Sequence, residues 1–144
     1  MPDVNSQAES SKRLPKPNNI VTGPTKMGTE FFRWWCVFLH PFIELTDREI
    51  DVVASFLNQR YELSKKISDQ SIIDTLLMGD EVRKKILEEC HITKQHLYVV
   101  MSNLRKNGVI INNTINPRLI PNIRHTDTDC FQLLILFKNT ENVQ

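Results

Sequence analysis

The amino-acid sequence predicts an α+β domain in which about four to five helices precede a C-terminal antiparallel β-hairpin. Between residues 46 and 107 apolar side chains recur at helical spacing, and after Gly108 they change to short runs typical of strands. The 144 residues, 40% of them hydrophobic, suffice for one domain with a core of ordinary size.

Residues 1–29 are rich in Asn, Ser, Pro, Lys and Gly and show no apolar period. Such a composition cannot bury enough apolar surface to offset the entropy lost on ordering. The prolines favour an extended path. Two interpretations remain open, a leader without fixed structure and an extended arm ordered by partner subunits. We expect the arm, followed by a domain over residues 30–140 and a short tail over 141–144.

The segment after the arm is unusually aromatic, with six of the chain's eleven aromatic residues between positions 31 and 42. The i, i+1, i+4 spacing of Trp34, Trp35 and Phe38 favours a short helix ending near 40–41, although strand spacing also fits part of the segment. Aromatic rings dominate both cores and interfaces, and a cluster this dense is expected to be shared between the two. The candidate interface residues are Phe31, Phe32, Trp34, Trp35 and Phe38.

A capping box formed by Thr46 and Glu49 predicts the start of the next helix, which should run to about Tyr61. A second helix is expected from near Asp69 until Gly79. The residues predicted to face inward are Ile50, Val53, Ala54 and Leu57 in the first of these helices, and Ile72, Ile73, Leu76 and Leu77 in the second.

Two further helices should follow, separated by a break over residues 91–93. The first begins at Asp80, and the second has Thr93 as its N-cap and ends before Gly108, which suits the left-handed C′ position. The predicted inward residues are Val82, Ile86, Leu87 and Cys90, then Leu97, Val100, Met101 and Leu104.

Beyond Gly108, residues 109–115 and 131–137 each suggest a strand. We expect them to pair antiparallel around a loop, 116–129, that contains Pro117 and Pro121.

This order of helix, short turn, helix, Gly and hairpin resembles the winged helix-turn-helix family. The resemblance covers roughly residues 46–137 and is strongest over 81–111. Its most specific pieces are Ile-Thr-Lys-Gln at 92–95 and Leu-Arg-Lys-Asn-Gly-Val-Ile at 104–110.

DNA-binding members of that family place the second helix of the motif in the major groove. Here the candidate nucleic-acid contacts are Lys94, Gln95, Tyr98, Ser102 and Asn103, with Arg105, Lys106 and Arg118 nearer the phosphates. Gln95 and Asn103 suit adenine edges. Against DNA binding, Tyr98 and Val99 place apolar bulk at the centre of this face. Residues 80–110 also contain six basic and four acidic residues, and this small excess of positive charge is weak support for phosphate binding.

The whole chain also resembles a small protein of crAss-like and related tailed bacteriophages. The similar segments are 45–52, 83–86, 104–110 and 116–121. The resemblance implies a virion assembly component, a head–tail connector or ring subunit, in which a winged-helix module packs against neighbours and the N-terminal arm clamps them.

Catalytic, cofactor and metal sites are not expected. Glycine occurs only at 23, 28, 79 and 108, so there is no Gly-rich phosphate loop, and no segment resembles a nucleophile motif. Cys36 with His40, and Cys90 and His91 with His96, lack the second pair that a zinc site needs. We therefore expect neither an enzyme nor a small-molecule binder.

The chain is also expected to be soluble. The apolar run 31–43 is too short to span a bilayer, the N-terminus lacks a signal-peptide core, and three cysteines suggest free thiols in a reducing compartment. The near-neutral net charge of +1 excludes polybasic and acidic tail proteins.

Two functions thus compete. The favoured one is a structural protein of a larger assembly, a homo-oligomeric ring, located in the virion if the chain is phage-derived and otherwise in the cytoplasm. The alternative is a transcriptional regulator that reads DNA with the helix over residues 93–105 and uses residues 109–137 as the wing.

Overall fold

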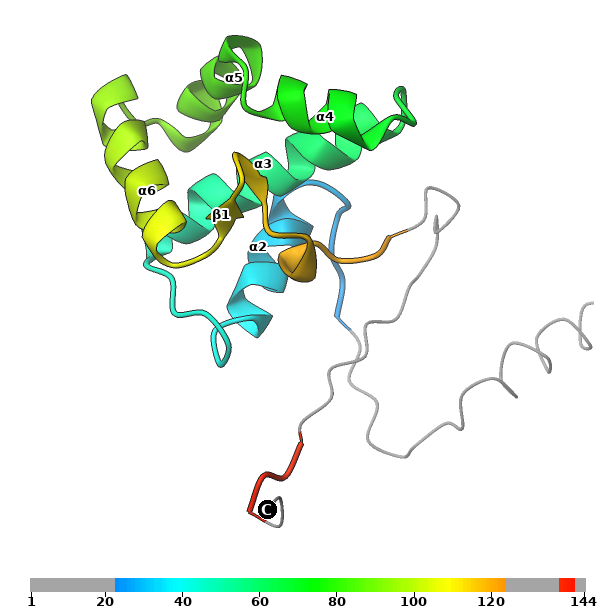
Figure 1. The fold of residues 1–144 in the computed structure, drawn as a ribbon, viewed down its shortest axis with the longest axis vertical. Coiled ribbons are helices and arrows are strands. Elements are labelled where there is room, and N and C mark those ends of the chain that lie inside the picture. The colour runs from blue at the N-terminus through cyan, green and yellow to red at the C-terminus, as the bar shows by residue number, and fades with distance from the viewer. Residues whose placement is uncertain (1–22, 124–137, 142–144) are drawn as a thin grey trace, which may run out of the picture.

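A computed structural model describes residues 23–123 and 138–141 (Figure 1). This part of the chain is mostly helical with one small antiparallel sheet, so the α+β class is confirmed. The elements are α2 (Thr29–Phe38), α3 (Asp47–Ser64), α4 (Gln70–Leu77), α5 (Asp80–Cys90), α6 (Lys94–Lys106), β1 (Ile110–Ile111), β2 (Thr114–Ile115) and a 3-10 helix (Pro117–Leu119).

The long helix α3 is the centre of the fold. It packs against α2, α4, α5 and α6, and Figure 1 shows α2 along one side of it and α4 and α5 along the other. The side chains of Val52, Ala54 and Phe56 on α3 are fully buried. Helices on several sides of α3 explain why its middle is buried all round rather than along one stripe.

The capping box that the sequence predicts at the start of α3 is confirmed. Glu49 N–H donates to Thr46 Oγ1 over 3.3 Å, and Thr46 N–H donates to Glu49 Oε1 over 2.9 Å. All four residues predicted to face inward are buried. The helix continues to Ser64, three residues beyond the predicted end.

Helix α4 buries only half of the apolar residues predicted to face inward. Ile73 and Leu77 are buried, whereas Ile72 and Leu76 are 48% and 43% exposed. Positions 73 and 77 are one turn apart and share the face that contacts α3 and α5, and each preceding residue is rotated by about 100° away from it. The inward prediction is therefore wrong for Ile72 and Leu76.

Helices α5 and α6 lie where the sequence predicts them, joined by a short turn in which His91 adopts a left-handed conformation with φ 52°. Thr93 caps α6, because its Oγ1 accepts from His96 N–H over 3.1 Å. Gly108 follows α6 with φ 77°, the left-handed geometry expected of it. The residues predicted to face inward are buried, except for the half-buried Leu87.

The predicted strand over 109–115 is wrong, because this segment is itself a hairpin. Asn112 and Asn113 have φ 50° and 57° and divide it into β1 and β2, which pair antiparallel with Ile110 opposite Ile115. Two successive left-handed residues form the turn that best matches strand twist, and Asn tolerates that conformation. Within the described residues the partner of β1 is therefore β2. The strand predicted over 131–137 lies outside the described residues, as do residues 1–22 of the predicted arm.

Among residues 23–123 and 138–141, no helix has the length and apolar character needed to cross a membrane.

Candidate functional site

The inner face of α2 belongs to the core. Phe31, Phe32 and Cys36 are 4%, 2% and 1% exposed. The rings of Phe31 and Phe32 meet edge to face with centroids 5.1 Å apart, and Phe32 lies 6.1 Å from the ring of Tyr61 on α3. Their assignment to a protein interface needs correction, since helical geometry turns positions 31, 32 and 36 towards α3.

Trp35 is a structural anchor between distant segments. Its Nε1–H donates to the carbonyl oxygen of Leu119 over 2.7 Å, and its half-buried ring packs against the core. The bond holds the 3-10 helix, which carries Arg118, against α2. Trp35 thus has its polar atom and part of its ring in contacts within the chain, and its assignment as an interface residue stays a prediction.

The outer face of α2 is apolar and exposed. Trp34 is 51% exposed, Val37 46% and Phe38 49%, and Phe42 in the turn after the helix is 59% exposed. We call Trp34, Val37 and Phe38 the α2 apolar surface. Trp34, Val37 and Phe38 are related by steps of three and four, so they share one side of the helix. Clusters of exposed apolar side chains of this kind mark interaction sites.

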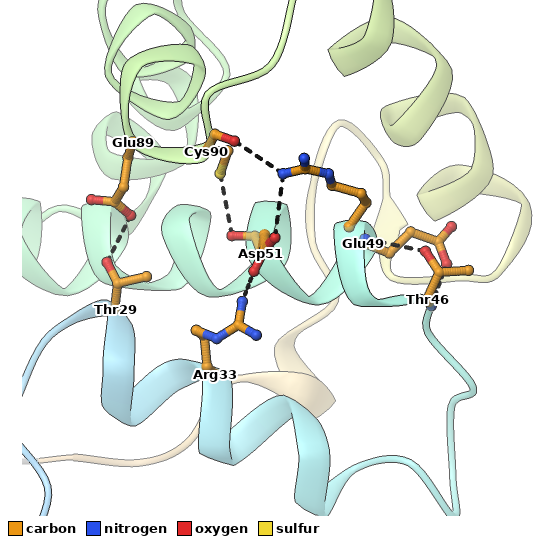
Figure 2. A network of polar contacts seen from close by, with 8 residues as sticks. Thr29, Arg33, Thr46, Glu49, Asp51, Glu89 and Cys90 are labelled. Carbon is orange, nitrogen blue, oxygen red and sulfur yellow. Dashed lines mark hydrogen bonds and ion pairs between the residues drawn. The ribbon is translucent and has the colours of Figure 1, made fainter.

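A polar network orients α2 on the rest of the domain (Figure 2). Arg33 forms an ion pair with Asp51 of α3, and Arg48 lies 3.6 Å from the same carboxylate. Arg48 also donates to the carbonyl oxygen of Cys90, at the end of α5, over 3.1 Å. Because these contacts link three helices, they set the direction in which the α2 apolar surface faces.

Figure 2 also shows a direct contact between α2 and α5. The hydroxyl of Thr29, at the start of α2, donates to Glu89 Oε1 of α5 over 2.7 Å. Helix α2 is thus held at its first turn by α5 and in its middle by α3.

The two cysteines of the described region are buried thiols. Burial raises the pKa of Cys36 to about 12. Burial, with the nearby carboxylate of Glu89 as a second cause, also raises the pKa of Cys90. Both thiols therefore stay protonated at neutral pH, and nucleophilic chemistry needs the thiolate. The described part of the chain contains no cluster of three or more His, Cys, Asp or Glu residues able to hold a metal ion.

The outward face of α6 presents every helix residue proposed as a nucleic-acid contact. The exposed residues are Lys94, Gln95, Tyr98, Val99, Ser102, Asn103, Arg105 and Lys106. Two of them are apolar or aromatic and lie at the centre of the helix, where Tyr98 is 50% and Val99 55% exposed. Arg118, also exposed, comes from the 3-10 helix that Trp35 holds against α2.

A groove of about 210 Å³ lies between α5 and α6 and was not predicted from the sequence. Its lining residues are Asp80, Arg83, Lys84, Leu87, Lys94, Leu97 and Tyr98. Only Lys94 and Tyr98 were among the functional residues predicted from the sequence. The basic run at 83–85 could have indicated the groove. It does so only once α6, which carries Lys94, is known to lie beside α5.

Comparison with known proteins returns no significant match, either to a protein-family model, to a curated protein or to a solved structure.

Proposed function

We propose that this chain is a winged helix-turn-helix protein with a non-enzymatic, structural role in a larger assembly of protein subunits. The observation that carries the proposal is the α2 apolar surface, because α2 already buries its other face in the core. Exposed aromatic side chains on a well-anchored helix are typical of a protein–protein contact. The resemblance to tailed-phage proteins makes a head–tail connector or ring subunit the favoured assembly, with residues 1–29 as an arm across neighbours.

A ring requires two different surfaces on each subunit, because its contacts run head to tail. Helix α4 lies on the other side of α3 from α2 (Figure 1). Its exposed residues Ile72 and Leu76 supply a second apolar surface. The two surfaces belong to different helices of one compact domain. This arrangement suits repeated association of identical chains.

We expect the purified full-length chain to self-associate, and the substitution Phe38→Glu to abolish this association. A carboxylate at a half-exposed position costs little in the monomer but is strongly unfavourable in a buried apolar contact. Sedimentation velocity across a concentration series measures the change, and thermal unfolding checks that the variant is folded. Val99→Glu, at a similarly exposed apolar position on α6, is the matched control and should associate normally. A wild-type chain that stays monomeric, or a Phe38→Glu variant that associates normally, would contradict the proposal.

DNA binding is the second candidate function, favoured by the simultaneous exposure of Lys94, Gln95, Ser102 and Asn103 on one side of α6. If this helix reads bases, Gln95→Ala should cost about 1–3 kcal/mol at one base position and leave folding unchanged. Fluorescence anisotropy with duplex DNA over a salt series measures this effect, since phosphate contacts give a steep salt dependence. Binding of equal strength to all sequences, or no salt-sensitive binding, would count against a regulator.

A further inference from the structure

The lining of the groove between α5 and α6 combines positively charged and apolar residues. Arg83 and Lys84 of α5 and Lys94 of α6 line it, and Asp80 is the one carboxylate among its lining residues. Apolar atoms come from Leu87, the buried Leu97 and Tyr98. An occupant should therefore offer both negative charge and an apolar group.

The size of the groove indicates the kind of occupant. Its volume of about 210 Å³ is smaller than the roughly 300–1,000 Å³ typical of small-molecule sites. It can take one or two side chains of a bound peptide. The half-exposed Tyr98 at its edge offers an aromatic face, and the exposed Lys84 and Lys94 offer ammonium groups to the same occupant.

Arg83 contributes a guanidinium group to the lining of the groove. Its Nε atom is buried and has no hydrogen-bond partner among the described residues, so this donor is not satisfied within the described part of the chain. Carboxylates match the planar donor geometry of a guanidinium group.

The same chemistry favours a protein partner over nucleic acid. A duplex backbone presents rows of phosphates joined by sugar units, and it offers no apolar side chain able to fill the space beside Leu87, Leu97 and Tyr98. A peptide can place a carboxylate and an apolar side chain at neighbouring positions. The lining also includes Asp80, and the α5–α6 segment as a whole has only a small basic excess.

We propose that the α5–α6 groove binds an acidic peptide segment that carries one apolar anchor residue. The anchor fills the space beside Leu97 and Tyr98, and flanking carboxylates pair with Arg83, Lys84 and Lys94. The inference rests on the proposed function in that the peptide belongs to a neighbouring protein of the assembly. It adds a further contact, separate from the apolar surfaces of α2 and α4, and states the chemistry of its partner.

The test uses the full-length chain and fluorescein-labelled synthetic peptides in anisotropy titrations. The probe has glutamates on both sides of one central phenylalanine, and its analogues replace either the glutamates with glutamine or the phenylalanine with serine. We expect saturable binding of the probe, and binding at least about tenfold weaker for the glutamine analogue, because charge complementarity is lost. The serine analogue should also bind measurably more weakly, because it lacks the apolar anchor.

Matched charge reversals locate the binding. The variant Lys84→Glu/Lys94→Glu should weaken probe binding at least about tenfold, since it turns attraction into repulsion. The control Lys26→Glu/Lys66→Glu makes the same change in net charge at exposed positions outside the groove and should bind the probe as the wild type does. Circular dichroism melts verify that both variants are folded.

Three results would overturn the inference: no saturable binding of the probe, equal weakening by both double variants, or duplex DNA bound at this groove in place of the peptide. The variant Phe38→Glu separates this inference from the proposed function. Because Phe38 lies on α2, that variant should lose self-association and still bind the probe. If the wild-type chain self-associates but does not bind the probe, the peptide-binding inference fails and the proposed structural role stands. If Phe38→Glu self-associates normally, only the proposed structural role is contradicted.

Discussion

Replacing Phe32 with alanine is expected to cost about 3–5 kcal/mol of unfolding free energy, the usual range for a buried aromatic ring. Phe32 is 2% exposed and lies between Phe31 and Tyr61. Phe38→Ala removes the same ring from the same helix, but its side chain is 49% exposed, so we expect about 0.5 kcal/mol or less in the monomer. Urea unfolding at a protein concentration low enough to keep the chain monomeric measures both values.

This pair tests which face of α2 belongs to the core. The two phenylalanines are six positions apart, and both are interface candidates predicted from the sequence. Equal losses of stability would mean that α2 does not pack as described, and the α2 apolar surface would lose its basis. A large loss of stability for Phe32→Ala, without one for Phe38→Ala, agrees with an α2 helix that has one buried face and one exposed face.

The second large effect is expected on α4, where two adjacent isoleucines differ in burial. Ile73 is 2% exposed, so Ile73→Ala should cost about 2–5 kcal/mol through lost apolar contacts and the cavity left behind. Ile72 is 48% exposed, and Ile72→Ala should change stability by no more than about 1 kcal/mol. The urea midpoint of each variant, at unchanged slope, reports the difference.

The two substitutions are chemically identical and one residue apart, so each is the control for the other. A larger loss for Ile72→Ala would show that α4 is rotated about its axis relative to the described packing. In that case the second apolar surface that a ring subunit needs would not exist on this helix.

Structural features that depend only on neighbouring residues in the chain could be predicted from the sequence. Thr46 and Thr93 cap the helices that follow them, and Gly108 adopts the left-handed conformation after α6. Each depends on a hydrogen bond or a backbone angle within one helical turn. The helices from 46 to 107 were therefore located to within a few residues.

The hairpin shows where local reasoning was insufficient. Residues 109–115 are rich in Ile, Val and Asn, and an unbroken strand and a tight two-residue turn were both compatible with that composition. Asn112 and Asn113 adopt left-handed angles because β1 and β2 then bury Ile110 and Ile115 against the core. The pairing was decided by that burial, which lies outside the segment itself.

The sequence by itself determined where the helices from 46 to 107 lie to within a few residues, and that their apolar stripes face a common core. It also indicated that the segment over residues 31–42 has more aromatic residues than one core face needs. Tertiary structure alone decided which aromatic residues of α2 are buried, which isoleucine of α4 packs inward, and that Arg83 and Lys84 meet Lys94 across a groove. The physical reason is the range of the interactions. Caps and turns depend on neighbours in the chain, whereas burial and charge juxtaposition depend on helices that α3 brings together from distant positions.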